Sequence, residues 1–313
     1  MPQLEIFVRP KKITSGKIII ILFIIILLIA IGLWVLGNYF YDYAIKSTPY
    51  EERTANNDNA PIIEDGKITE LEMTSRDDLK LIAYEVENEE SDHKWVIVVH
   101  GYKSSAKDMG KYIDNFYKLG YSVLALDLRG QGASEGNYIG MGFKDRLDVI
   151  DWAQGIIDKD KDAEINLFGI SMGGATVMMA SGEDLPINIK SIVSDCGYAL
   201  LYDEFSYQLK QQFGFPDFPV LNAADMVTRI KAGYTYEEAS ALDAVGQSVT
   251  PTLFIHGTQD DFVPFDNLQI LYDNASCEKD MLVVQGAGHA ESEEIAGEEY
   301  WNTIKSFMDE HRE

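Results

Sequence analysis

The sequence predicts an α/β fold with a mostly parallel, doubly wound sheet, preceded by one helix long enough to span a membrane. Two observations lead to this prediction. Short, continuous apolar runs alternate along the chain with segments of helical periodicity, a pattern typical of parallel strands covered by helices on both faces. Near the N-terminus, twenty consecutive residues carry no charge.

The composition is that of a globular protein and narrows the possible functions. The chain has 313 residues, of which 46% are hydrophobic and 25% are charged, so it can bury a large core. Its formal net charge of −25 argues against nucleic acid as a partner. Two cysteines cannot supply a four-cysteine metal site, and we expect neither a metal nor a cofactor. Cys196 and Cys277 fall at opposite edges of the predicted sheet, so we expect both to be free.

The uncharged stretch covers residues 18–37 and is dominated by Ile and Leu. With a rise of about 1.5 Å per residue, a helix of this length spans roughly 30 Å, the thickness of a bilayer's hydrocarbon core. A cleaved signal peptide is the alternative, but its apolar region is usually about 7–15 residues long. Trp34 and the aromatic cluster at 39–43 suit a membrane interface. We therefore expect an uncleaved transmembrane anchor.

The flanking charges predict how this anchor is oriented. Residues 1–17 hold four of the 26 basic and one of the 51 acidic side chains, which leaves a net charge of −28 on the remainder. Since basic segments stay in the cytoplasm, we expect a cytoplasmic tail at 1–17 and an extracellular catalytic domain on a single-pass cell-membrane protein. Residues 38–66 are polar and are predicted to be an irregular spacer.

The fourth part of the chain, residues 67–313, is predicted to form one domain. Its first two strands are expected at 67–74 and 79–86, with a turn between them. Further strands are predicted at 95–100, 122–126, 165–169, 189–194, 252–256 and 281–284. Helices are predicted at 108–118, 142–158, 172–180, 266–274 and 294–310.

A long insertion separates two of these strands. Residues 195–250 are too many for a bare loop, and helical patterns occur around 222–231 and 236–245. We therefore expect a small helical cap over the strand ends. Its many aromatic residues either line a pocket for an acyl group or pack the cap onto the body.

Ser171 is the candidate nucleophile. It lies in the segment Gly169-Ile170-Ser171-Met172-Gly173, which follows a predicted strand and opens a predicted helix, the context of a G-x-S-x-G nucleophile elbow. A second match to this pattern centres on Ser134, but no strand directly precedes it and no helix directly follows. We expect Ser134 to belong to a structural loop.

A serine hydroxyl needs a general base, and the chain has five histidines. His289 follows the last predicted strand in a glycine-containing loop, which makes it the best candidate. We expect His93 and His311 to be solvated. His100 and His256 end strands and are each followed by glycine, so they could lie near the site, but we expect them to shape turns.

A carboxylate must orient the base. Asp260 follows the penultimate strand by four residues and is the predicted residue. The adjacent Asp261 is the fallback, and Asp195 is a third possibility because it also lies at the carboxyl end of a strand.

The tetrahedral intermediate of acyl transfer requires preorganised hydrogen-bond donors for its oxyanion. One is expected from the backbone N–H of Met172, directly after the nucleophile. The second is expected from the backbone N–H of Tyr102, in the loop that follows the strand at 95–100.

These motifs resemble those of the α/β-hydrolase superfamily. The matching pieces are H-G-Y at 100–102, D-L-R-G-Q-G-A-S at 127–134, G-I-S-M-G-G at 169–174, H-G-T-Q-D-D-F-V-P at 256–264 and G-H at 288–289. They span roughly residues 67–310 in the superfamily's Ser…Asp…His order. The chain looks like membrane-anchored or secreted bacterial hydrolases near the serine aminopeptidase and prolyl-oligopeptidase-like group. The resemblance favours Asp260 over Asp261. Gln131 departs from the histidine common in relatives, in a loop that the resemblance does not make catalytic.

Together, these features predict an α/β-hydrolase fold and a serine hydrolase that cleaves carboxylic esters through an acyl-enzyme. The expected partners are a small-molecule ester or peptide substrate and, through the N-terminal helix, the membrane. A serine peptidase of the aminopeptidase-like type and a thioesterase are alternatives. A non-catalytic binding domain on the same scaffold is a further one.

Overall fold

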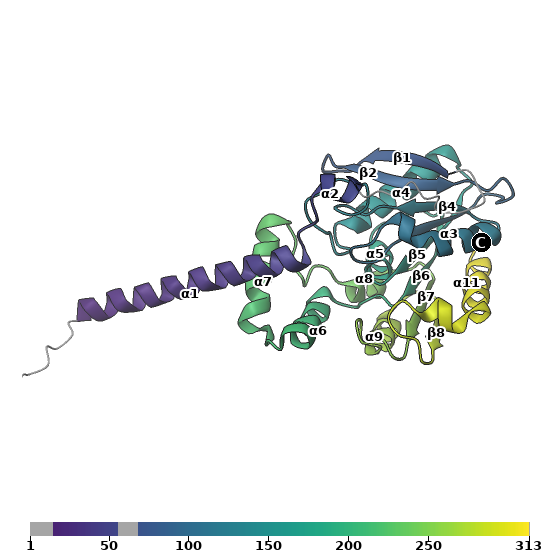
Figure 1. Ribbon diagram of the computed structural model, residues 1–313. Coiled ribbons are helices and arrows are strands. Elements are labelled where there is room, and N and C mark those ends of the chain that lie inside the picture. Colours follow the sequence, from purple (N-terminus) through teal and green to yellow (C-terminus); the bar gives the residue numbers. More distant parts are fainter. Residues whose placement is uncertain (1–14, 56–67, 313) are drawn as a thin grey trace, which may run out of the picture.

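One mixed sheet of eight strands forms the centre of the described chain, with helices on both faces (Figure 1). The structure is a computed structural model that describes residues 15–55 and 68–312. The strand order is β1-β2-β4-β3-β5-β6-β7-β8. The β1–β2 and β2–β4 pairs are antiparallel, and the other pairs are parallel. The strands are β1 Ile68–Thr74, β2 Lys80–Val86, β3 Lys94–Val99, β4 Ser122–Leu126, β5 Glu164–Ile170, β6 Ile189–Asp195, β7 Thr252–Gly257 and β8 Lys279–Val284.

In the body of the protein the helices lie close to their predicted positions, with three exceptions. The helices are α1 Ser15–Ala44, α2 Tyr50–Ala55, α3 Gly110–Lys118, α4 Asp145–Lys159, α5 Met172–Ala180, α6 Leu201–Phe213, α7 Asp217–Lys231, α8 Ala241–Gln247, α9 Asp266–Asn274, α10 Ser292–Ala296 and α11 Glu298–Glu310. The single helix predicted at 294–310 is two helices, because Gly297 adopts a φ of 54° between α10 and α11. The helical pattern at 236–245 begins only at Ala241, and α6 was not predicted as a helix.

Helices cover both faces of the sheet, and successive side chains of a strand point to opposite faces. One strand therefore contributes residues to two cores. In β3, Trp95, Ile97 and Val99 join the core that is covered by α4, α5, α8 and α9. Val96 and Val98 join the opposite core, which is covered by α3 and α11. This arrangement explains why the parallel strands appear in the sequence as continuous apolar runs.

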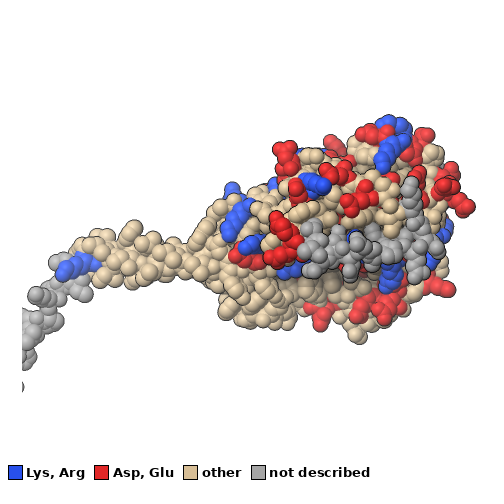
Figure 2. All heavy atoms as spheres, turned by 45° about the horizontal axis from the view of Figure 1, so that its top comes forward, with Lys and Arg blue, Asp and Glu red and all other residues tan. Residues whose placement is uncertain are grey.

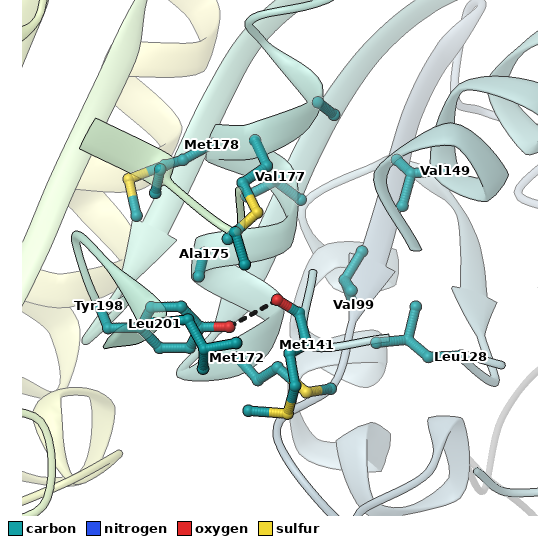
Figure 3. Packing of buried hydrophobic residues seen from close by; sticks show 14 of the residues in the cluster. Val99, Leu128, Met141, Val149, Met172, Ala175, Val177, Met178, Tyr198 and Leu201 are labelled. Atoms are coloured by element: carbon teal, nitrogen blue, oxygen red, sulfur yellow. Dashed lines mark hydrogen bonds between the residues drawn. The ribbon is translucent and has the colours of Figure 1, made fainter. Parts of the chain in front are cut away.

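The cap predicted at 195–250 contains α6 and α7, whereas α8 packs back onto α5 in the body. Figure 3 shows the core beneath the start of this insertion. There the hydroxyl of Tyr198 donates a hydrogen bond of 2.7 Å to the carbonyl oxygen of Met141. This bond fixes the segment that enters the cap to the loop before α4, next to Met172.

The N-terminal helix continues beyond the predicted span. Residues 38–66 were predicted to be an irregular spacer, but α1 runs on to Ala44 and α2 covers 50–55. Residues 56–66 of that spacer, and residues 1–14 of the predicted tail, lie outside the described residues. The end of α1 is buried by the body and the cap: Ile45, directly after it, is fully buried, and a Cβ on Gly37 would overlap the backbone of Ala223 in α7. Tertiary packing of this kind stabilises a helical turn whose sequence is polar and aromatic.

Candidate active site

Ser171 lies in the sharp turn between β5 and α5. It adopts a φ of 56° and a ψ of −121°, a conformation that L-residues rarely occupy. A Cβ on Gly169 would lie 2.2 Å from the carbonyl oxygen of Gly173, and a Cβ on Gly173 would lie 2.1 Å from that of Val99. Only glycine fits at both positions, so the two glycines of the motif allow β5, α5 and β3 to approach closely around Ser171.

Ser171, His289 and Asp260 form one chain of hydrogen bonds, although they are far apart in the sequence. His289 follows β8, Asp260 follows β7, and both loops lie at the carboxyl edge of the sheet. The Nε2 atom of His289 lies 2.8 Å from the Oγ of Ser171. Its Nδ1 atom lies 2.8 Å from the Oδ2 of Asp260. The three residues that the sequence predicted as nucleophile, base and orienting acid are therefore brought together.

The surroundings of Asp260 keep it ionised. Its Oδ1 accepts hydrogen bonds of 2.9 Å from the backbone N–H groups of Phe262 and Val263. The Nε2 of His256 lies 3.2 Å from its Oδ2. Burial raises the pKa of Asp260, but hydrogen bonds from His256 and His289 outweigh it and hold the pKa well below its usual value.

An ionised Asp260 determines the tautomer of His289. A carboxylate can only accept, so Nδ1 of His289 must carry the proton that it donates to Asp260. In the neutral ring, Nε2 is then left with a lone pair toward the hydroxyl of Ser171. This is the arrangement in which an imidazole can accept a proton from a serine.

The two alternative carboxylates do not contact His289. The fallback, Asp261, is exposed. Asp195 is fully buried, and its carboxylate accepts hydrogen bonds from the hydroxyls of Ser292 at 3.0 Å and Tyr300 at 2.9 Å. Burial raises the pKa of Asp195 to about 6.

The segment expected to supply the second oxyanion donor lies against the candidate nucleophile. A Cβ on Gly101 would come within 3.5 Å of the Cβ of Ser171, so the peptide that precedes Tyr102 is close to the elbow. The hydroxyl of Tyr102 donates to the carbonyl oxygen of Ala44 at 2.8 Å, and the N–H of Lys103 donates to the Oε1 of Gln131 at 2.7 Å. The loop that carries Tyr102 is thus held both by the end of α1 and by a buried glutamine.

The remaining histidines and the second serine motif have structural roles. The Nδ1 of His100 is 2.7 Å from the carbonyl oxygen of Gly101, and its Nε2 accepts the N–H of Leu128 at 3.1 Å. Ser134 is fully buried and donates to the carbonyl oxygen of Asp127. The prediction that His311 is solvated was wrong. Its side chain is 8% exposed, and its Nδ1 lies 2.7 Å from the carbonyl oxygen of Phe307 in the last helix.

An apolar pocket opens in front of Ser171, with about 800 Å³ of empty space including its mouth. Its walls come from the end of α1, the helices α6 and α7, and the loops that carry Tyr102 and Phe262. Phe205, Leu209, Phe213, Leu221 and Tyr236 are among the lining residues. Aromatic residues of the cap therefore line a pocket, one of the two roles considered for them.

One carboxyl group interrupts the apolar lining. Glu204 on α6 is buried, and its Oε1 accepts a hydrogen bond of 3.0 Å from Gln208. Its Oε2 has no hydrogen-bond partner within residues 15–55 and 68–312. Burial raises the pKa of Glu204 to about 8, so that it is mostly neutral at pH 7.

Two clusters of His, Cys, Asp and Glu have the spacing of metal ligands in the described parts of the chain. The first consists of Cys196, Asp260 and His289, but both ring nitrogens of His289 already take part in the hydrogen-bond chain. The second, His93 with Asp160 and Asp162, is largely exposed. Cys196 and Cys277 are both free and buried.

Comparison with known proteins identifies the fold family that residues 94–223 match. A family model described as alpha/beta hydrolase fold matches residues 94–223. The structure resembles an esterase of Pyrococcus furiosus, with a TM-score of 0.65 and 23% identity over 79% of this chain and 92% of that one. The chain has the α/β-hydrolase fold. The structure also resembles an acylaminoacyl peptidase of Pyrococcus horikoshii, with a TM-score of 0.60 and 18% identity over 85% of this chain and 44% of that one.

Relatives in sequence include proteins from bacteria, plants and yeast. The uncharacterized protein YqkD of Bacillus subtilis is 27% identical over 68% of this chain and 70% of its own length. The α/β hydrolase domain-containing protein WAV2 of Arabidopsis thaliana is 26% identical over 62% of each chain. The uncharacterized membrane protein YNL320W of Saccharomyces cerevisiae is 23% identical over 86% of this chain and 89% of its own. The esterase and the peptidase, at 23% and 18% identity, share the α/β-hydrolase fold with this chain.

Sequence reasoning missed the roles of three residues around this site. His256 was considered as a residue that could lie near the site, but its contact with Asp260 was not predicted. Gln131 was expected to affect local packing alone but holds the loop that carries Tyr102. Glu204 was not singled out. His256 and Gln131 are polar residues inside recognised motifs, and this position is the signal that could have revealed their roles.

Proposed function

We propose that this protein is a serine hydrolase that cleaves carboxylic esters through an acyl-enzyme. The hydrogen-bonded chain of Ser171, His289 and Asp260, which opens onto an apolar pocket, is the observation that carries the proposal. Apolar linings suit the acyl part of an ester.

The first half-reaction forms the acyl-enzyme. The Oγ of Ser171 attacks the carbonyl carbon of the ester while the Nε2 of His289 takes the hydroxyl proton. The negative charge on the carbonyl oxygen is stabilised by the backbone N–H groups of Tyr102 and Met172. When the intermediate collapses, the bond to the leaving alkoxy oxygen breaks, and His289 returns the proton to that oxygen.

The second half-reaction repeats these steps with water. Water gives a proton to His289 and attacks the acyl carbon, and the bond from that carbon to the Oγ of Ser171 then breaks. The proton returns to Ser171 and the carboxylic acid is released. Throughout, ionised Asp260 stabilises the imidazolium form of His289.

The lining of the pocket favours an ester over the substrate of an aminopeptidase. An enzyme that binds a substrate amine holds it with ionised carboxylates. The described residues of this lining are mostly apolar and include one carboxyl group, that of Glu204, whose pKa is raised by burial. A thioester contains the same acyl group, so a thioesterase is the closer alternative.

The experiment is an activity panel on the full chain in detergent micelles. Nitrophenyl esters, acyl thioesters and aminoacyl-naphthylamides are offered to the wild type, to Ser171→Ala and to Ser134→Ala as the matched control. We expect ester turnover by the wild type and its loss only in Ser171→Ala. Turnover that survives in Ser171→Ala refutes the nucleophile, and turnover of amides alone refutes the ester proposal.

We also propose that α1 anchors the enzyme as a single-pass membrane protein, with its N-terminus in the cytoplasm. Residues 15–44 form one apolar helix, long enough to cross a bilayer, whose most apolar stretch is not buried by the body. In Figure 2 the part of this helix that extends from the body is a stem without charged side chains except at its N-terminal end. The test is an epitope tag at the C-terminus of the chain in intact cells: labelling by an impermeant antibody is expected, and labelling only after permeabilisation contradicts the orientation.

A further inference from the structure

The apolar pocket and the N-terminal helix share residues. Phe40, Tyr43 and Ala44, all in the last two turns of α1, form part of the pocket wall. Phe40 packs edge-to-face on Phe213 of the cap, with 5.2 Å between the ring centroids. The segment proposed to leave the membrane is therefore also a wall of the proposed acyl site.

The distance along α1 places this pocket close to the bilayer. The predicted apolar span ends at Gly37, directly before Asn38, and α7 packs against α1 at Gly37. Phe40 and Ala44 follow Gly37 by three and seven residues, which corresponds to about 5–10 Å along a helix axis. A bilayer's polar headgroup layer extends a comparable distance beyond its hydrocarbon core.

The cap carries large exposed apolar side chains, and one of them, Phe215, lies near Phe40 of α1, with 6.4 Å between the ring centroids. Four large hydrophobic side chains of the cap are exposed, namely Phe215 (44%), Phe218 (77%), Met226 (46%) and Ile230 (63%). Apolar groups of this size are usually buried or mark a contact with a membrane or another protein. Since α7 crosses α1 at the end of the span, the cap is continuous with the part of the chain that meets lipid (Figure 1).

We propose that the substrate is a long-chain acyl ester of a membrane lipid, which reaches Ser171 from the bilayer with its acyl chain against the wall formed by α1 and α6. The proposal rests on the proposed function, since it names the ester that the site cleaves. The remainder of the chain after residue 17 carries a net charge of −28, which disfavours anionic headgroups. An uncharged or zwitterionic lipid is therefore the expected substrate.

The chemistry follows the ester mechanism. The acyl carbon forms a bond with the Oγ of Ser171, its bond to the lipid's alkoxy oxygen breaks, and His289 protonates that oxygen. A lysolipid or an alcohol leaves first. Water then releases the fatty acid and restores Ser171.

The first test asks whether the ester arrives through the bilayer. The full chain is reconstituted into dioleoylphosphatidylcholine vesicles that also contain dioleoylglycerol, and oleate release is followed by mass spectrometry. In a parallel sample, dioleoylglycerol is supplied in separate protein-free vesicles. We expect release to be about tenfold faster when enzyme and ester share a vesicle. Equal rates overturn delivery from the bilayer.

The second test asks whether α1 is part of the acyl site. Ala44→Leu adds volume to the pocket wall, whereas Ala30→Leu makes the same change on an exposed part of α1. The readout is the ratio of kcat/KM for methylumbelliferyl oleate to that for methylumbelliferyl acetate. We expect Ala44→Leu to lower this ratio by about tenfold, because pockets discriminate at the level of single methylene groups, and Ala30→Leu to leave it unchanged.

The outcomes separate this inference from the proposed function. If neither ester is hydrolysed by the wild type, the proposed function fails. If the acetate is hydrolysed but the oleate is not, or if both alanine variants give the wild-type ratio, the function stands and the lipid inference fails. Cleavage of an S-acylated peptide in preference to every lipid also overturns the inference.

Discussion

The segment that follows the proposed membrane span is part of the folded core, which leads to a quantitative prediction for Ile45→Ala. Ile45 is 0% exposed and belongs to the core on the α5 side of the sheet. The substitution removes three carbon atoms, and about 0.8 kcal/mol per buried carbon gives a loss of about 2.4 kcal/mol. The cavity left behind adds to this, within the range of about 2–5 kcal/mol observed for such changes.

The assay is thermal unfolding of the full chain in detergent, followed by tryptophan fluorescence. For a domain of this size, each kcal/mol shifts the Tm by about 2–4 °C, so we expect a decrease of about 5–10 °C. Ile29→Ala is the matched control, because Ile29 is on the same helix but is 56% exposed. A Tm for Ile45→Ala equal to that of the control would refute the view that this segment belongs to the folded body.

Three further predictions concern the pocket, the acid and the elbow. Glu204 is neutral below its pKa of about 8 and gains its charge as the pH rises through that value, so the KM for a long-chain ester should rise above pH 8. Glu204→Gln should abolish this rise, and an identical pH profile would contradict the assignment. Asp260→Asn should lower kcat by about 10⁴-fold through loss of the correct tautomer, whereas the exposed Asp261→Asn should not; equal effects in ester assays would reverse our choice. Gly173→Ala brings a Cβ to 2.1 Å from a backbone carbonyl of β3 and should unfold more easily, whereas Gly155→Ala meets nothing within 4 Å and should be stabilised by about 0.5–1 kcal/mol; denaturant titration that ranks them otherwise contradicts the steric argument.

The positions of the residues of the candidate site were largely predictable, because the topology of the sheet constrains where they lie. Parallel strands bring their carboxyl ends to one edge, so Ser171, Asp260 and His289 could be chosen from their positions after apolar runs. Asp260 was preferred to Asp261 for its position four residues after the strand, and the family resemblance supported that choice. The hydrogen bond between His289 and Asp260 is consistent with that choice.

Features that depend on tertiary packing were not predictable in this way. The turn of α1 after Gly37 is polar and aromatic and suggested a spacer, but it is helical because the cap covers it. Glu204 gives no local signal, because its raised pKa arises from burial by helices that are distant in the sequence. The role of Gln131 depends on a contact across 28 positions with Lys103.

The central claim is that Ser171 is the activated nucleophile of an acyl-transfer site. The most direct measurement is reaction of the full chain with a fluorophosphonate, followed by mass spectrometry of the labelled peptides. We expect one adduct, on Ser171, which is lost in Ser171→Ala and strongly slowed in His289→Ala. Adducts on another serine, or no adduct on a folded wild-type chain, would contradict the account.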